Sequence, residues 1–153
     1  MVGRLPDGLS GKRGEQDVIA VTKDDFSVEQ LIRKMKRPES GAVVSFLGTV
    51  KGIVDESKID SLTVESYEDM ALKKMTDLRD EAMKRFGVAD VTIVHRVGTL
   101  KPTDNIVFVA VSSSHRQQAF EACHWIIDEL KKSVPFWKKE HTQAGDRWVK
   151  EES

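Results

Sequence analysis

Cationic side chains flank a helix break in the last third of the chain. A helical pattern begins at His115-Arg116 and ends at Lys131-Lys132, and beyond Pro135 the chain continues as Phe136-Trp137-Lys138-Lys139-Glu140. A helix start favours anions through its free amides and dipole, and arginine adds a bidentate donor. These residues can therefore line an anion-binding pocket. They can equally be solvated residues whose stems cover Trp137, and their spacing leaves both interpretations open.

Helix and strand periodicity predicts which face of its element each lysine side chain occupies. Lys131 follows Ile127 by four positions and is expected to extend the core-facing stripe, whereas Lys132 turns toward solvent. Successive side chains of a strand point to opposite faces, which separates Lys138 from Lys139. Lys131 and Lys138 are therefore the better candidates for one shared pocket.

The length of the predicted helix separates the two cationic groups. Lys131 lies fifteen positions after Arg116, which corresponds to about 22 Å at about 1.5 Å per residue. A small substrate cannot touch both within one protomer. If both groups serve one pocket, one of them must come from a neighbouring subunit. We therefore expect a symmetric dimer with shared sites, and full activity in a strict monomer would contradict it.

Metal and thiol chemistry have little support in the sequence. His95, His115, His124 and His141 form no pair at the short spacings typical of metal ligands, so we predict no metal site. Cys123 lies on the apolar stripe of the same predicted helix, where a thiol usually behaves as a small hydrophobe. If this protein carries out sulfur chemistry, we therefore expect the sulfur to come from another molecule.

The composition is that of a globular domain. The chain has 153 residues, of which 39% are hydrophobic and 32% charged, and the net charge of -1 gives no global basic field for nucleic acid. The apolar runs are too short for a membrane span, no signal-peptide core opens the chain, and the lone cysteine excludes a disulfide framework. We expect a cytoplasmic protein with a flexible tail at residues 1–16 and one domain at 17–153.

Periodicity and turn signals predict an α+β fold. Ser27 resembles a helix N-cap, Pro38 must follow the end of that helix, Gly48 indicates a bulge or a close backbone approach, and Gly87 suits a helix C-cap. The segment 51–58 is expected to be a polar loop, and 101–104 a turn. The helices are expected at 27–37, 68–86 and 114–134, and the strands at 18–21, 41–50, 59–67, 91–97, 106–111, 136–141 and 147–149.

Eight segments over about residues 17–150 carry a family resemblance. In combination and in this order they resemble the large, catalytic subunit of molybdopterin synthase. The segments are Phe46-Leu47-Gly48-Thr49-Val50-Lys51, Glu65-Ser66-Tyr67-Glu68-Asp69-Met70-Ala71, His95-Arg96-Val97-Gly98, Ser114-His115-Arg116, Ala119-Phe120-Glu121-Ala122, Asp128-Glu129-Leu130-Lys131, Val134-Pro135-Phe136-Trp137-Lys138-Lys139-Glu140 and Gly145-Asp146-Arg147-Trp148-Val149.

The resemblance implies a sulfurtransferase of molybdenum-cofactor biosynthesis that needs no cofactor of its own. Members of this family convert cyclic pyranopterin monophosphate (precursor Z) to molybdopterin. The sulfur comes from the C-terminal Gly-Gly thiocarboxylate of a small ubiquitin-like subunit. The resemblance further implies a heterotetramer around a homodimer of large subunits, and an α/β-hammerhead-like sheet with packed helices and a small antiparallel β extension.

The resemblance also implies roles for individual residues. Lys131 and Lys138 match the two active-site lysines, with Lys131 beside the carbonyl of the small subunit's C-terminus. The positions that match substrate-binding residues are Thr49, Val50, Lys51, His115, Arg116, Lys139 and Glu140, of which His115 and Arg116 come from the opposite protomer. Lys51 stands where the family usually has arginine, so it keeps the charge but loses the fork geometry.

Two other functions are compatible with parts of the pattern. A non-catalytic module could dock a ubiquitin-like tail without transferring sulfur, in which case tail binding would not need Lys131. A single-stranded nucleic acid could stack on Phe136 and Trp137 beside the lysines. The near-neutral charge and the single aromatic cluster count against the nucleic acid.

Overall fold

The main sheet has four strands, in the order β1-β6-β8-β2. The computed structural model of the chain describes residues 18–149, so the predicted tail at 1–16 lies outside the described residues. β1 runs parallel to β6, and the other neighbouring pairs are antiparallel. Their bounds are β1 Ile19–Thr22, β6 Asp90–Arg96, β8 Asn105–Ser113 and β2 Ala42–Thr49.

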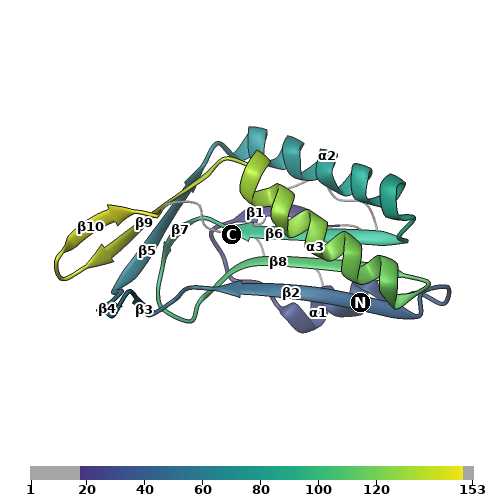
Figure 1. Ribbon diagram of the computed structural model, residues 1–153, viewed down its shortest axis with the longest axis horizontal. Helices are drawn as coiled ribbons and strands as arrows, with labels where there is room; N and C mark the ends of the chain where they lie inside the picture. Colours follow the sequence, from purple (N-terminus) through teal and green to yellow (C-terminus); the bar gives the residue numbers. More distant parts are fainter. Residues whose placement is uncertain (1–17, 150–153) are drawn as a thin grey trace.

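Helices cover both faces of the main sheet (Figure 1). The long helices α2 (Glu68–Phe86) and α3 (Arg116–Ser133) lie on one face, and the short helix α1 (Val28–Met35) lies on the other. The continuous apolar run at 106–111 in β8 suits a strand buried on both faces, and β6 is buried along all but its last residue. Each fully buried large side chain, such as Phe108 between the sheet and α1, stabilises the fold by about 1.5–3 kcal/mol.

A second antiparallel sheet extends from one end of the main sheet (Figure 1). Its strand order is β10-β9-β5-β7, and it has a small core of its own. The predicted α+β fold with a small antiparallel β extension is thus confirmed. The bounds are β10 Gly145–Trp148, β9 Phe136–Thr142, β5 Ser61–Ser66 and β7 Gly98–Leu100.

The predicted helix ends and bulge are confirmed. Ser27 Oγ accepts a hydrogen bond from the Gln30 amide at 3.2 Å, and α1 ends at Met35, ahead of the proline. Gly87 has a positive φ of 67° and donates its amide to the Met83 carbonyl, as a left-handed helix cap should. The register of β2 against β8 shifts after Gly48.

Three short strands were not predicted from the sequence. The expected loop at 51–58 contains a hairpin of β3 (Ile53–Val54) and β4 (Ser57–Lys58), whose turn residues Asp55 and Glu56 both have positive φ. The third is β7, which pairs with β5. Helix α3 begins at Arg116, two residues later than expected, and β10 begins at Gly145, two residues earlier than expected.

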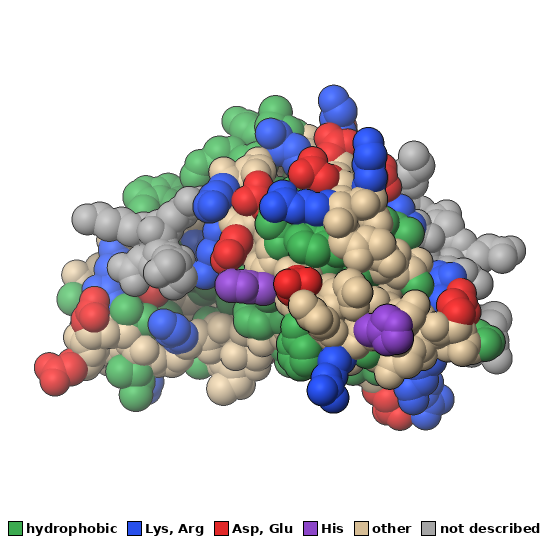
Figure 2. Space-filling view, turned by 45° about the vertical axis from the view of Figure 1, so that its right-hand side comes forward, with side chains coloured by type: hydrophobic (Ala, Val, Ile, Leu, Met, Phe, Trp, Pro, Cys, Tyr) green, Lys and Arg blue, Asp and Glu red, His purple; other side chains and the backbone are tan. Residues whose placement is uncertain are grey.

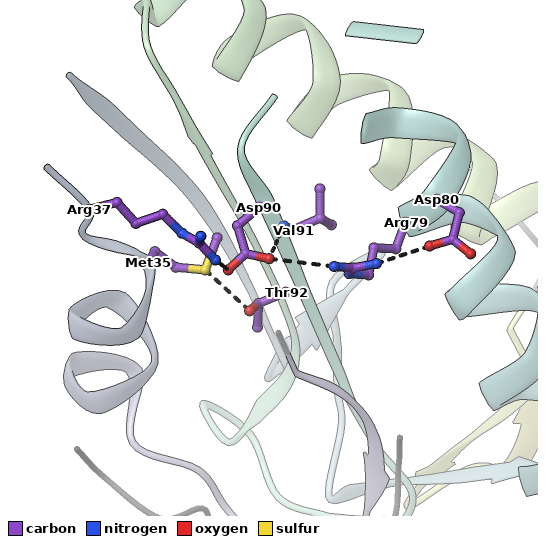
Figure 3. Close-up of polar contacts among 7 residues, drawn as sticks. All are labelled: Met35, Arg37, Arg79, Asp80, Asp90, Val91 and Thr92. Carbon is purple, nitrogen blue, oxygen red and sulfur yellow. Dashed lines mark hydrogen bonds and ion pairs between the residues drawn. The ribbon is translucent and has the colours of Figure 1, made fainter. Parts of the chain in front are cut away.

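A buried carboxylate joins the layers at the start of β6 (Figure 3). Asp90 is 1% exposed, and its Oδ2 lies 2.7 Å from Nη2 of Arg37, which follows α1. Nη2 of Arg79 on α2 lies 3.9 Å from the other carboxylate oxygen, which also accepts the Val91 amide at 2.8 Å. One carboxylate therefore connects both helical layers to the main sheet.

Candidate active site

The register of β9 places Lys138 on the inner face of the second sheet. Lys138 pairs with Val64 and Glu140 pairs with Leu62, and directly opposed residues of antiparallel strands share a face. Val64 and Leu62 are both buried in the small core. Lys138 and Glu140 therefore lie beside an apolar surface, where a charge is less screened than in open water.

Lys139 lies on the opposite face of the same sheet. It pairs with Thr63, and its Nζ lies 4.9 Å from the ring centroid of Trp148, a cation–π distance. The predicted separation of Lys138 from Lys139 is confirmed. The structure thus does not bring Lys139 to the face that carries Lys138 and Glu140.

The connection after β2 comes to the same end of the molecule. Val50 is buried in the small core, and its amide and carbonyl are bonded to Asp104 and Thr103 at 2.9 and 2.8 Å. Its neighbours Thr49 and Lys51 are exposed. Because the amide and the carbonyl of Val50 are both hydrogen-bonded, the backbone of the neighbouring Lys51 is held close to the inner face of the second sheet.

Lys131 lies in the last turn of α3, just before the chain enters β9 (Figure 1). The Ser66 hydroxyl donates to the Pro135 carbonyl at 2.9 Å and fixes this junction. The expectation that Lys131 extends the buried stripe is wrong for the single chain, because the stripe continues through Leu130 and Val134 and leaves Lys131 exposed. Lys132 is exposed too and lies 3.8 Å from a carboxylate oxygen of Glu129.

His115 and Arg116 lie at the other end of α3. Both are exposed, and His115 occupies the N-cap position without a side-chain capping hydrogen bond. Figure 1 shows this end of α3 beside β2 and the opposite end beside the start of α2. The structure therefore leaves His115 and Arg116 about 22 Å of helix away from Lys131 in one chain, as the spacing predicted.

Two residues beside Phe136 and Glu140 were not proposed as site residues from the sequence. His95 is buried, and its ring stacks on Phe136 with centroids 3.6 Å apart and planes at 9°. Burial, and secondarily the charge of Lys138, lowers the pKa of His95 to about 3. Nε of Arg147 lies 2.7 Å from Glu140 Oε1. Both residues fall in family-like segments, and no other signal in the sequence marks them.

Cys123 is buried on α3, as predicted for a small hydrophobe, and burial raises the pKa of its thiol to about 11. Across residues 18–149, no three His, Cys, Asp or Glu side chains gather closely enough to hold a metal ion. No helix in this range is long and apolar enough to cross a membrane.

Surface charge on the face shown in Figure 2 is mixed. Lys and Arg side chains alternate there with Asp and Glu, and no extended basic area is visible. Nucleic acid binding needs a stripe of positive charge along the phosphate path. This face therefore offers no support for the nucleic-acid alternative.

Comparisons with known proteins identify the family. Residues 21–133 match the family model described as MoaE protein. The chain belongs to the MoaE family. A molybdopterin synthase catalytic subunit of Pyrococcus abyssi is 42% identical over 89% of this chain and 93% of its own length. The Escherichia coli protein of the same name is 46% identical over 86% and 88%. The family resemblance, and with it the prediction of an enzyme subunit, is confirmed.

Solved structures of MoaE proteins share the fold. A molybdopterin synthase structure from Staphylococcus aureus has a TM-score of 0.79 and 35% identity, covering 88% of this chain and 96% of that one. A Helicobacter pylori structure described as a complex of subunits 1 and 2 of molybdopterin-converting factor has a TM-score of 0.63 at 23% identity, over 75% of each chain. The α+β sheet with packed helices that the resemblance implied is confirmed.

Proposed function

We propose that this protein converts cyclic pyranopterin monophosphate to molybdopterin. The sulfur would come from the C-terminal thiocarboxylate of a small ubiquitin-like subunit. The observation that carries this proposal is the placement of Lys138, in a MoaE-family chain, beside the small core that also holds Val50, the neighbour of Lys51. The buried thiol of Cys123 supports it too, because the chain then needs an outside source of sulfur.

The proposed chemistry makes specific demands on these cations. The sulfur attacks a carbon of the substrate's side chain, the bond from that carbon to a phosphate oxygen breaks, and the oxygen keeps the electron pair. Lys51 and Lys138, with Arg116 of a second protomer, would stabilise that developing charge. Hydrolysis of the remaining acyl–sulfur bond then releases the small subunit's tail as a carboxylate, with Lys131 beside its carbonyl.

Four further residues would shape the substrate pocket around these cations. Glu140, held by Arg147 at 2.7 Å, offers a fixed acceptor for the pterin on the inner face of the second sheet. Thr49 and Val50 would contribute the backbone beside Lys51. His115 would act from the second protomer. Lys139 lies over Trp148 on the outer face, so we assign it only a peripheral role in binding substrate.

In a homodimer, the start of α3 from one protomer would lie beside the end of α3 from the other. Phe46 and Leu47 on the edge strand β2 are 37% and 40% exposed, and Phe120 on α3 is 61% exposed. Hydrophobic side chains at an open sheet edge favour association, and most soluble homo-oligomers are symmetric dimers. Because α3 starts beside this edge, a second copy packed here would carry its His115 and Arg116 with it. One small subunit on each copy would then give a heterotetramer.

Charge placed in this hydrophobic surface should separate the dimer. We expect Phe120→Glu to behave as a folded monomer in light scattering and to lose most product formation, because each site would lack its second protomer. Lys84→Glu introduces a negative charge at an exposed position of α2, which packs on β1 and β6 and not on the edge strand β2, and it should leave both properties unchanged. Full activity of a strictly monomeric Phe120→Glu variant would contradict the shared site.

Mixed dimers test the shared site directly. Lys131→Ala and Arg116→Ala chains should each be inactive alone, but a dimer containing one of each has one of its two sites intact. Refolding the two variants together should therefore restore product formation. If every site lay within one protomer, mixing would restore nothing.

The enzyme assay separates the proposal from its alternative. The purified chain is incubated with precursor Z and a thiocarboxylated small subunit, and dithiolene product is followed by mass spectrometry. A docking module would bind the small subunit's tail without turning over the pterin. We place the reaction in the cytoplasm, where a lone thiol such as Cys123 stays reduced.

A further inference from the structure

His95 lies at the joint between the two sheets. It is the penultimate residue of β6 in the main sheet, whereas its stacking partner Phe136 is the first residue of β9 in the second sheet. Phe136 packs against the core under α2 and α3 and against the small core as well. The stack therefore fixes where β9 leaves the main body of the protein.

The hydrogen bonding of His95 defines its tautomer. Nδ1 lies 2.8 Å from the Arg96 carbonyl, which can only accept, so Nδ1 carries the proton. The ring is neutral at ordinary pH, because burial and the Lys138 charge lower the pKa of His95 to about 3. Its Nε2 is therefore an unprotonated acceptor.

Lys138 faces the same space as this ring. Phe136 and Lys138 are two positions apart on β9, so their side chains share one face of the strand. After burial, the charge of Lys138 is the second cause of the lowered pKa of His95. The His95 ring is stacked on Phe136, and the Lys138 side chain shares the strand face of Phe136, beside a surface that screens charge poorly.

We propose that His95 is a positioning residue, whose neutral imidazole holds Phe136 by stacking and sets the position of the Lys138 ammonium for the reaction. This inference rests on the proposed function, because it assigns His95 a task at that site. His95 itself touches no reacting atom in this scheme. It acts by holding Phe136 at the start of β9 and by presenting Nε2 as a hydrogen-bond acceptor.

Two substitutions separate the stacking of His95 from its acceptor. His95→Phe keeps a planar ring but removes both nitrogens, whereas His95→Gln keeps an acceptor on a planar amide. We expect His95→Phe to lower kcat about ten- to a hundredfold with KM for the pterin unchanged, and His95→Gln to recover part of that loss. His124→Phe, at an exposed position on α3, should match the wild type. Equal losses in the Phe and Gln variants, or an unchanged kcat in His95→Phe, would overturn the proposal.

A spectroscopic test does not depend on turnover. Nitrogen chemical shifts of His95 should report the Nδ1–H tautomer and a neutral ring through mildly acidic pH. In Lys138→Met the pKa of His95 should rise, because the opposing charge is gone. An unchanged His95 titration in Lys138→Met would overturn the positioning role even in an active enzyme. If this coupling is seen but the wild type makes no molybdopterin, the proposed function is what fails.

Discussion

Lys131→Ala should abolish sulfur transfer while leaving a folded dimer. Loss of a lysine that acts on the reacting groups should slow product formation by about 10²- to 10⁴-fold. Because Lys131 is exposed in the last turn of α3, its removal should change the free energy of unfolding by no more than about 0.5 kcal/mol. The rate is measured by single-turnover mass spectrometry with saturating thiocarboxylated small subunit.

The neighbouring residue provides a matched control for Lys131. Lys132→Ala removes the same side chain one position along the helix, together with only a surface ion pair to Glu129. We expect it to keep near-normal product formation. Near-normal turnover in Lys131→Ala would remove this lysine from the mechanism. Equal losses in the two variants would indicate a diffuse electrostatic effect in place of a specific role.

Asp90→Ala should be the most destabilising of the substitutions considered. The variant leaves the guanidinium groups of Arg37 and Arg79 facing a buried space without the carboxylate between them (Figure 3). Removing one partner from a buried ion pair costs about 3–5 kcal/mol. We expect a lower denaturation midpoint with an unchanged m-value, measured by urea unfolding at neutral pH.

Asp80 offers a control of the same residue type. Its carboxylate pairs with Arg79 at 2.9 Å, but its side chain is 63% exposed, so Asp80→Ala should cost about 1 kcal/mol or less. Adding Arg37→Met to Asp90→Ala should recover part of the loss, because one uncompensated charge disappears with it. If Asp90→Ala costs no more than Asp80→Ala, the buried carboxylate is not what joins the layers.

Local patterns predicted the long elements of the fold well. Helix α2 begins and ends as expected, because both of its signals are local. Apolar residues recur at helical spacing, and the glycine that caps the helix follows directly in the sequence. Strand β7 was missed because three residues carry little periodicity, and its conformation depends on β5, more than thirty positions earlier. The β3–β4 hairpin is shorter still. The order of the strands in each sheet could not be predicted either, because it depends on contacts between segments that are distant in the sequence.

The candidate site was predictable to a similar degree. Strand alternation alone separated Lys138 from Lys139, because that rule needs only adjacent residues. The neighbours of Lys138 were not predictable, since His95 reaches it from a different sheet through the ring of Phe136. The burial of Lys131 was mispredicted, because helical phase gives a direction and cannot show where the covering layer ends.

The buried thiol of Cys123 has a consequence for how the enzyme withstands oxidants. With a pKa of about 11, only about one thiol in ten thousand is ionised at pH 7. Peroxides react with the thiolate, so this side chain is a poor target for sulfenic acid formation. The same inertness keeps it from capturing sulfur as a persulfide. In the proposed reaction, the Cys123 thiol would thus not compete with the pterin for the small subunit's sulfur.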